Sequence, residues 1–514
     1  MSDTSLPTLI QKMQQPDFYP HPVQEPIQLI QTHISYVLLT GDYAYKLKKP
    51  LNLGFLDFST LEQRHHFCQE ELRLNQRGAD RWYLQVLPIT QQGDSYQLNG
   101  DGEPVEYTLQ MKQFPQDGLF VGMLEQGKLT TAHMETVGKL TAQYHAKSQT
   151  SDYILSFGKP ETIKASIDEN YRQTEKYVNG PQTRKQLGQT KTYTDKIFQE
   201  RAPLFQGRIE EKKIRECHGD LHLKNLALYN GEIILFDCIE FNESFRFVDT
   251  MYDVAFMVMD TESKERPDLG NAFLNTYLEQ TGDWEGLPLL PLYLSRQAYV
   301  RAKVTSLLLD DANVPDSDKQ AAAETAAHYY YLSWQYTQPT QGQMVMMSGL
   351  SGSGKSTVAK QVARHNRAIH LRTDAVRKHL AGIGVDQKGD DSIYTPEMSE
   401  KTYNRMLELG KMLAAEGWTV ILDGKYDRVA YRKTVLDGAK SQNLPVTILH
   451  CTADEEVLRD RLNQRKGDIA DATSDLLNSQ KAKAEAFTQA EQPYVCSVDT
   501  TKDILAQLPE NLKV

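Results

Sequence analysis

The sequence predicts two domains of different fold class, an α+β domain followed by an α/β domain with a parallel sheet. Three observations carry this prediction. A chain of 514 residues is too long for a single hydrophobic core. Strand-like segments precede helical ones in the first 336 residues, whereas short apolar strands alternate with helices from residue 343 onward. A polar stretch with Pro and Gly, residues 336–342, separates the two patterns.

The composition is that of an ordinary globular protein and excludes several classes. Hydrophobic residues make up 40% of the chain, and no apolar run approaches the roughly 20 residues that cross a bilayer. The N-terminal segment has neither the basic start nor the apolar core of a secretion signal. The five cysteines lack metal-ligand spacing, which is typical of reduced thiols. We therefore expect a cytoplasmic protein with no membrane partner.

Negative charge is concentrated in the first domain. The first 342 residues carry 33 basic and 45 acidic side chains, whereas the remainder carries 24 and 23. An acidic surface binds the nucleic-acid backbone poorly, because phosphate contacts need Lys and Arg. We therefore do not expect nucleic acid as a partner, except as a 5′-end substrate of the second domain.

The boundary stretch and the change of pattern predict the domain limits. The first domain is expected over residues 1–336. A linker is expected at 337–342 and the second domain at 343–514.

Local signals place the elements of the first domain. Residues 33–49 predict a hairpin, because two apolar runs flank the turn residues Thr-Gly-Asp. Ser59–Glu62 has the pattern of a capping box and predicts a helix that ends near residue 76. Further strands are predicted at 83–90 and 106–114. A strand-rich segment, 214–240, interrupts the later helical region.

The strand-rich segment contains a pattern suited to phosphoryl transfer. The run HGDLHLKN places Asp220 and Asn225 one loop apart, and the apolar strand EIILF then ends at Asp237. Phosphoryl transfer needs a carboxylate that orients the acceptor hydroxyl and ligands that hold magnesium near the phosphates. We expect Asp220 in the first role, and Asn225 and Asp237 as the metal ligands.

These motifs resemble those of the aminoglycoside phosphotransferase family, which has a protein-kinase-like fold. The resemblance implies a bilobal first domain, with a small lobe at about 25–115 and a large lobe at about 116–336. The resemblance rests on HGDLHLKN, Phe236-Asp237 and the segment from Asp249 to Asp253. It implies that Lys46 contacts the nucleotide phosphates and that Glu71 pairs with Lys46. Lys48 is the alternative to Lys46, since it lies on the same strand face, and Glu70 is the alternative to Glu71. The glycine-rich loop G-x-G-x-x-G does not precede Lys46.

The second domain opens with a phosphate-binding loop. The motif G-x-x-x-x-G-K-[ST] follows an apolar strand and precedes a helical segment, which is the context in which it binds nucleotides. Glycines turn successive backbone N–H groups toward phosphate oxygens, the lysine reaches the terminal phosphates, and the hydroxyl after it holds magnesium. The expected binding residues are Gly349, Ser351, Gly352, Ser353, Gly354, Lys355, Ser356 and Thr357.

Two later strands supply acidic side chains. Asp423 ends the strand TVILD and is expected as the second magnesium ligand. Asp374, after the strand AIHLR, is expected to act as the base for an acceptor hydroxyl, although N-capping of the next helix also explains an Asp there. The neighbouring Arg372 and Arg377 are candidates for holding an anionic group.

Two arginines follow at helical spacing. Arg461 and Arg465 lie four residues apart and are expected to close over the bound nucleotide. Plain surface charge is the alternative interpretation, because acidic residues are close in the sequence.

This domain is similar to small P-loop kinases of metabolites, the gluconate, shikimate, adenylyl-sulfate and chloramphenicol kinase group. The resemblance rests on the phosphate loop, Asp374 and Asp423. The pattern R-x-D-x-x-R also resembles polynucleotide 5′-kinases.

The combined expectation is an ATP-dependent kinase with two sites. Each site would use ATP and Mg²⁺ to phosphorylate a hydroxyl of a small molecule. A regulatory role for one domain, in which ATP is bound without turnover, is the alternative from another functional class.

Overall fold

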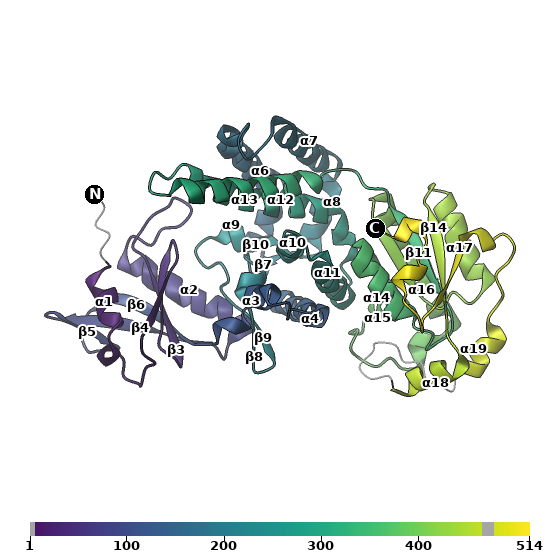
Figure 1. The fold of residues 1–514 in the computed structure, drawn as a ribbon, viewed down its shortest axis with the longest axis horizontal. Helices are drawn as coiled ribbons and strands as arrows, with labels where there is room; N and C mark the ends of the chain where they lie inside the picture. Colours follow the sequence, from purple (N-terminus) through teal and green to yellow (C-terminus); the bar gives the residue numbers. More distant parts are fainter. Residues whose placement is uncertain (1–5, 465–476, 514) are drawn as a thin grey trace. The chain divides into compact units, whose positions relative to one another are not determined.

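The computed structural model describes residues 6–464 and 477–513, which form two compact units. The first unit comprises the residues up to Leu129, Gln143–Ile163 and Pro203–Phe256. The second comprises Thr130–Ala142, Lys164–Ala202 and the residues from Met257 onward. The second unit therefore combines helices from the first half of the sequence with the complete α/β part of the chain (Figure 1).

An antiparallel sheet of six strands forms the small lobe of the first unit. Its strand order is β1-β2-β3-β6-β4-β5, and α2 packs against β4 and β6. The strands are β1 (Gln28–Gln31), β2 (Ser35–Leu39), β3 (Tyr43–Lys48), β4 (Tyr83–Gln92), β5 (Ser95–Leu98) and β6 (Pro104–Lys112), and the helices are α1 (Thr8–Met13) and α2 (Leu61–Ala79).

The predicted hairpin and helix both occur, and the helix begins one residue later than expected. Strands β2 and β3 pair around the turn at residues 40–42. Helix α2 is capped by Thr60, whose side chain accepts from the N–H of Gln63 while the Gln63 side chain accepts from the N–H of Thr60. The capping box is thus formed by Thr60 and Gln63, not by Ser59 and Glu62, because the N–H of Ser59 already donates to Asp57.

The rest of the first unit carries the strand-rich segment predicted near residues 214–240. Two short antiparallel pairs, β7 with β10 and β8 with β9, hold the connecting loops in place. The elements are α3 (Phe120–Glu125), α5 (Asp152–Leu155), β7 (Ile214–Glu216), β8 (Leu226–Tyr229), β9 (Glu232–Leu235), α9 (Glu243–Arg246) and β10 (Phe247–Asp249). Helices with residues in both units are α4 (Thr131–Lys147), α6 (Pro160–Thr174), α8 (Ala202–Glu210) and α10 (Thr250–Glu262).

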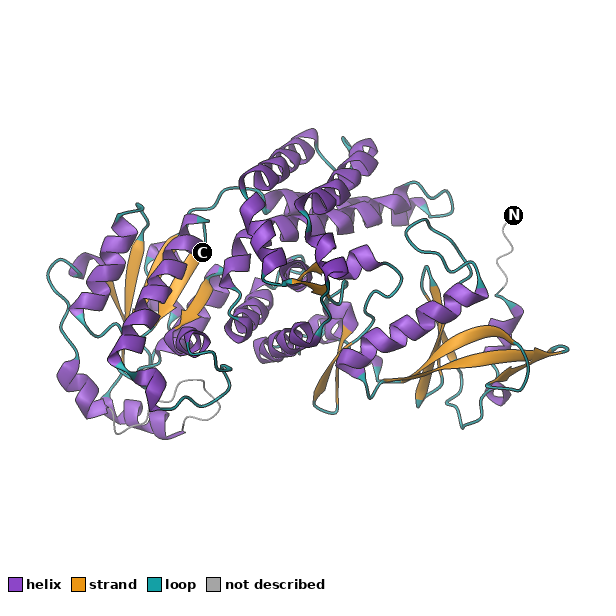
Figure 2. Ribbon diagram, turned by 180° about the vertical axis from the view of Figure 1, so that it is seen from behind, coloured by secondary structure: helices purple, strands orange, loops and turns teal. Residues whose placement is uncertain are grey.

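The second unit contains further helices and a parallel sheet (Figure 2). Its helical part comprises α7 (Arg184–Glu200), α11 (Pro267–Thr281), α12 (Leu290–Ser306) and α13 (Asp316–Gln335). The five-stranded sheet has the order β12-β13-β11-β14-β15, and all neighbouring strands are parallel. Its strands are β11 (Gln343–Ser348), β12 (Ile369–Arg372), β13 (Thr419–Asp423), β14 (Val446–Thr452) and β15 (Val495–Asp499).

Helices cover both faces of the parallel sheet, as the alternation of apolar strands and helices predicted. Val345 and Met347 of β11 pack against α14, whereas Met344 lies beside Gly410 of α16 on the other face. This confirms the predicted fold class of the α/β part. The helices are α14 (Lys355–Asn366), α15 (Thr373–Leu380), α16 (Pro396–Ala415), α17 (Val429–Lys440), α18 (Glu455–Gln464) and α19 (Leu477–Lys483).

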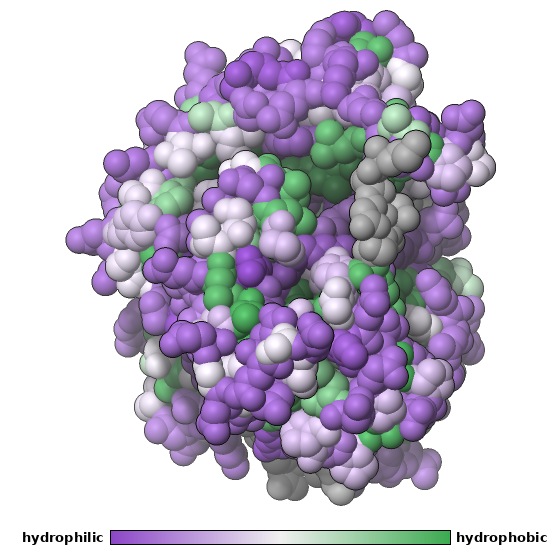
Figure 3. All heavy atoms as spheres, turned by 90° about the vertical axis from the view of Figure 1, so that its left-hand side faces the viewer, coloured by the Kyte–Doolittle hydropathy of each residue, from purple (hydrophilic) through white to green (hydrophobic). Residues whose placement is uncertain are grey.

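The surface view and the helices give two further observations. On the face that Figure 3 shows, hydrophilic residues predominate and hydrophobic ones are exposed in small separate groups. Among the described residues, no helix is both long enough and apolar enough to span a bilayer.

The connection before β11 allows a test of local packing. A Cβ atom on Gly342 would lie 1.9 Å from the backbone oxygen of Ala414, at the end of α16. We expect Gly342→Ala to lower the free energy of unfolding by about 1–3 kcal/mol, because backbone must move to make room. Urea unfolding followed by circular dichroism measures this change.

Gly188 provides the matched control. It is exposed inside α7, and a Cβ atom there would meet nothing within 4 Å. Gly188→Ala should instead stabilise the protein by about 0.5–1 kcal/mol through helix propensity. Equal effects of the two substitutions would contradict the assigned packing of Gly342.

Candidate active sites

The first candidate site is the loop between β7 and β8 in the first unit. Asn225 Nδ2 donates to Asp220 Oδ2 at 2.9 Å and to the Asp220 backbone oxygen at 2.9 Å. His222 Nε2 lies 3.2 Å from Asp220 Oδ2. Because the Asn225 nitrogen faces Asp220, the Asn225 oxygen is left to act as a ligand for a cation. His222 lies inside the HGDLHLKN motif, but the sequence pattern gave it no role.

A buried carboxylate holds this loop from behind. Asp253 accepts hydrogen bonds from the backbone N–H groups of His218 at 3.1 Å and Gly219 at 2.9 Å, and it contacts His145 Nε2 at 3.0 Å. Burial by itself raises the pKa of Asp253, but these hydrogen bonds and the charges of His145 and His218 outweigh it and lower the pKa. Asp253 thus fixes the backbone that carries Asp220.

Lys46 of β3 connects two acidic residues from other elements. Its Nζ lies 2.7 Å from Glu71 Oε1 on α2 and 2.6 Å from Asp237 Oδ1 after β9. Burial alone would lower the pKa of Lys46, but Asp237 and Glu71 raise it well above its ordinary value. The structure therefore places Lys46, Glu71 and Asp237 in direct contact.

The alternatives Lys48 and Glu70 have other partners. Lys48 is buried, lies 2.8 Å from Glu71 Oε2 and also pairs with Glu240. Glu70 instead pairs with Arg73 at 2.8 Å. Nothing in the sequence pointed to Glu240, because its pairing with Lys48 depends on a contact between β3 and a segment almost two hundred residues later.

The second candidate site begins at the phosphate loop between β11 and α14. Gly349, Gly352 and Gly354 have φ angles of 137°, 79° and 85°. A Cβ atom on Gly349 would lie 2.5 Å from the Cys451 backbone oxygen, and one on Gly352 would lie 2.6 Å from that of Leu458. Both the backbone conformation and the close approach therefore require glycine at these positions.

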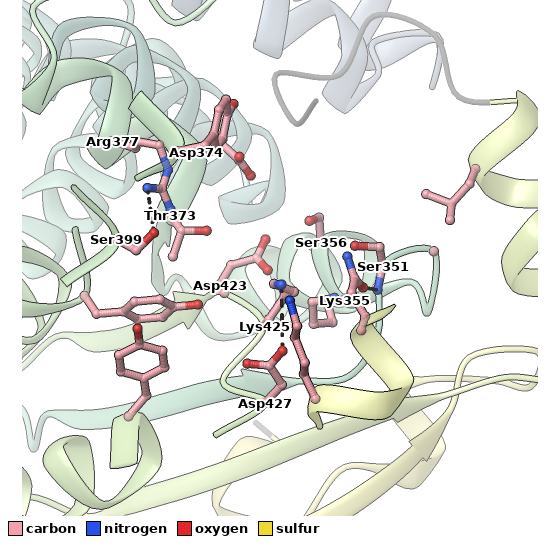
Figure 4. Close-up of a pocket in the computed structure, with 18 of the residues that line it drawn as sticks. Ser351, Lys355, Ser356, Thr373, Asp374, Arg377, Ser399, Asp423, Lys425 and Asp427 are labelled. Atoms are coloured by element: carbon pink, nitrogen blue, oxygen red, sulfur yellow. Dashed lines mark hydrogen bonds and ion pairs between the residues drawn. The ribbon is translucent and has the colours of Figure 1, made fainter. Parts of the chain in front are cut away.

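This loop borders a cavity of about 960 Å³ in the α/β part. Lys355, Ser356, Asp374 and Asp423 all line it, as does Arg461. Figure 4 shows the phosphate-loop residues on one side, Asp374 on the other and Asp423 between them. Also lining it are the predicted residues Ser351, Gly352, Gly354 and Thr357. Ser353 is buried, and among the described residues its hydroxyl has no hydrogen-bond partner.

Asp423 ends β13 and is buried. His370 Nε2 contacts Asp423 Oδ2 at 3.0 Å, and Arg372 Nε lies 4.0 Å from the same oxygen. Burial by itself raises the pKa of Asp423, but His370, Arg372 and Lys355 outweigh it and lower the pKa to about 2. An ionised carboxylate beside the hydroxyl of Ser356 in one cavity is a donor set that fits Mg²⁺, which prefers oxygen ligands.

Asp374 and the two nearby arginines occupy different surroundings. Asp374 is the second residue of α15, and Arg372 occupies the N-cap position. The alternative explanation of Asp374 as the N-cap of this helix is therefore wrong. Arg377 lines the cavity, and its Nη1 donates to Ser399 Oγ at 3.3 Å and to the Ile393 backbone oxygen at 3.1 Å. Arg372 instead pairs with Glu279 of α11 at 3.4 Å.

Only Arg461 of the predicted pair lies within the described residues. Arg461 of α18 donates through Nη1 to Thr500 Oγ1 at 2.8 Å and through Nη2 to the Thr500 backbone oxygen at 3.1 Å. A Cβ atom on Gly354 would lie 3.2 Å from Arg461 Nη1, so Arg461 reaches the edge of the phosphate loop from its own helix. Arg465 lies outside the described residues.

The sequence pattern gave no role to several residues that line the cavity. Lys425 follows Asp423 by two positions and lies 3.7 Å from Asp427, which also lines the cavity. The rings of Tyr403 and Tyr431 stack with their centroids 4.2 Å apart. The place of Lys425 at the carboxyl end of a strand was a usable signal, whereas the tyrosines lie on separate helices and gave none.

Comparison with known proteins identifies relatives of almost the whole chain. A family model described as an AAA domain matches residues 344–487. An uncharacterized protein of Mycobacterium tuberculosis (strain H37Rv) is 30% identical over 486 residues, covering 93% of this chain and 94% of its own. An uncharacterized protein of Mycobacterium bovis matches equally well. The chain belongs to the same family as these mycobacterial proteins. Residues 344–487, which the AAA-domain model matches, include the phosphate loop and four of the five strands of the parallel sheet.

Solved structures resemble one part of the chain or the other. A sugar kinase from Janibacter sp. is 24% identical and covers 34% of this chain and 91% of its own, with a TM-score of 0.24. An amicoumacin kinase in complex with AMP-PNP, Ca²⁺ and Ami is 13% identical and covers 63% and 92%, with a TM-score of 0.40.

Mutation distinguishes the contributions of Lys46 and Lys48 to the stability of the first unit. Lys48→Met leaves Glu240 buried without its cation and should lower the free energy of unfolding by about 3–5 kcal/mol. Lys46→Met leaves Glu71 paired with Lys48, so we expect a smaller loss of stability. Urea unfolding of both variants measures the difference. A larger loss for Lys46→Met would contradict this assignment.

Proposed function

We propose that the protein is an ATP-dependent kinase with two sites, each of which transfers the γ-phosphoryl group of ATP to a hydroxyl of a small molecule. The observation that carries this proposal is the single cavity that gathers Lys355, Ser356, Asp374 and Asp423. These residues supply a cation for the phosphates, oxygen ligands for a metal and a carboxylate for the acceptor. Phosphoryl transfer needs this combination.

At the P-loop site, each side chain has a role that follows from its position. Lys355 and the backbone N–H groups of the loop would bind the phosphates of ATP. Asp374 would accept a proton from the acceptor hydroxyl, and Arg377 would orient an anionic group of the acceptor. Ser356 and Asp423 would hold Mg²⁺, which neutralises phosphate charge when bound.

At the first site, the loop geometry supports a corresponding division of roles. Asp220 is partly exposed and is held by Asn225 and His222, so it can face an acceptor hydroxyl. The Asn225 oxygen and the Asp237 carboxylate would hold Mg²⁺. Lys46 would bind the nucleotide phosphates while Glu71 keeps its Nζ in place.

The size of the P-loop cavity supports a small acceptor. A volume of about 960 Å³ lies at the upper end of the range for small-molecule sites, which is about 300–1,000 Å³.

We also propose the cytoplasm as the location, because the five cysteines are free thiols in the structure.

A polynucleotide 5′-kinase is the second candidate for the P-loop site. Arg377 in the cavity favours it, because a guanidinium there could hold a phosphate of the strand. Arg372, the other arginine of the R-x-D-x-x-R pattern, is buried against Glu279 and is not placed to contribute. The metabolite kinase therefore remains the better supported reading.

Asp220→Ala and Lys355→Ala should each abolish one set of products. We expect transfer to the acceptor of the mutated domain to fall by at least about 100-fold, since each substitution removes a group that acts on the transferred phosphoryl. Incubation of a metabolite extract with labelled ATP, followed by chromatography, measures the products of each variant. Asp117→Ala and Lys440→Ala, which change exposed side chains, are matched controls.

Three outcomes distinguish the readings. Products lost in one variant each support two independent kinases. Loss of the same product in both variants contradicts independent sites and favours one regulatory domain. Label transferred to a 5′-hydroxyl oligonucleotide, and lost in Lys355→Ala, would identify the P-loop domain as a polynucleotide kinase.

A further inference from the structure

Strand β12 is the edge of the parallel sheet, and helix α11 covers that edge within the second unit. The N–H of His370 donates to Asn275 Oδ1 at 2.7 Å. Asn271 Nδ2 and Asn275 Nδ2 both donate to the Ala368 backbone oxygen, at 2.9 Å and 3.0 Å. The two asparagines are one helical turn apart, so a single face of α11 satisfies backbone groups that an edge strand otherwise leaves unpaired.

His370, whose backbone N–H donates to Asn275 of α11, also contacts Asp423 through its side chain. His370 Nε2 is 3.0 Å from Asp423 Oδ2, and both side chains are 5% exposed. His370 is therefore fixed at its N–H by a helix from the first half of the sequence and reaches the active-site carboxylate with its ring. A shift of β12 would move this ring relative to Asp423.

Helix α11 also contacts a second residue of β12, Arg372. Glu279, one turn beyond Asn275 on α11, lies 3.4 Å from Arg372 Nη1. Arg372 is 7% exposed in its side chain and approaches Asp423 Oδ2 at 4.0 Å. Two residues of β12 that face Asp423 are thus each held by a residue of α11, at positions i and i+4 of that helix.

We propose that Asn275 and Glu279 of α11 are positioning residues of the P-loop site, which set the orientation of the Asp423 carboxylate through His370 and Arg372. This inference rests on the proposed function, because Asp423 is taken as a Mg²⁺ ligand. Residues that orient a metal ligand commonly change metal affinity by about 10- to 100-fold when they are removed. The P-loop kinase site therefore extends beyond the motif-bearing part of the sequence, into residues 267–281.

The competing explanation is purely structural. Helix α11 buries the edge of the sheet, so its contacts could contribute to stability without any effect on the metal site. The two explanations differ in what happens to Mg²⁺ dependence in a variant that remains folded.

Calorimetric titration of the full chain with a non-hydrolysable ATP analogue distinguishes a positioning role of α11 from a purely structural one. The titration is run over a series of Mg²⁺ concentrations and in EDTA, for wild type, Asn275→Ala and Glu279→Gln. We expect the Mg²⁺ concentration for half-maximal binding to rise about 10-fold in Asn275→Ala and several-fold in Glu279→Gln. Affinity in EDTA should be unchanged, because the phosphate loop is untouched.

Gln280→Ala is the matched control on the same helix. Gln280 Nε2 contacts Asp386 Oδ2 at 3.3 Å, in the loop after α15, and does not reach β12 or Asp423. It should keep the wild-type Mg²⁺ dependence.

The outcomes are separable. If Asn275→Ala and Glu279→Gln lower the melting temperature but keep the wild-type Mg²⁺ dependence, α11 is only structural and the inference is overturned. If Asn275→Ala does not fold, Glu279→Gln decides in the same way. If wild type itself binds the analogue equally with and without Mg²⁺, the metal role of Asp423 in the proposed function fails as well.

Discussion

A buried carboxylate must be matched by hydrogen-bond donors or positive charge, and both candidate sites are organised around this constraint. Asp423 is buried at the end of β13, and His370 and Arg372 approach it from the neighbouring strand. Asp253 is buried behind the first site and is matched by His145 and two backbone N–H groups. Removing one partner from a buried ion pair typically costs about 3–5 kcal/mol, which makes these contacts a condition of folding as well as of site geometry.

The constraint explains why supporting residues come from distant parts of the chain. Glu71 is buried and contacts both Lys46 and Lys48, and the two lysines in turn contact Asp237 and Glu240. Both lysines lie on β3, whereas the carboxylates that they contact come from α2 and from the segment after β9. The small-lobe sheet, helix α2 and the segment after β9 therefore have to meet at one point.

The motifs made much of the site predictable. The phosphate loop was predicted because its glycines, lysine and hydroxyl lie next to one another in the sequence, and the parallel sheet was predicted from the alternation of apolar strands and helices. The same reasoning identified Asp374 and Asp423, which both line the cavity. The start of α2 was misplaced by one residue, because Ser59 and Thr60 both fit a capping pattern and only the contact with Asp57 distinguishes them.

The sequence by itself determined the two fold classes and predicted the residues expected to touch phosphate and metal, because the spacing of those residues along the chain expresses that chemistry. Only the tertiary structure decided which groups surround them. Three contacts join segments that lie about a hundred residues or more apart in the sequence. They are the ion pairs of Lys48 with Glu240 and of Arg372 with Glu279, and the hydrogen bond from the His370 N–H to Asn275. Such contacts leave no local pattern, since they depend on how elements pack and not on the order of residues within one element.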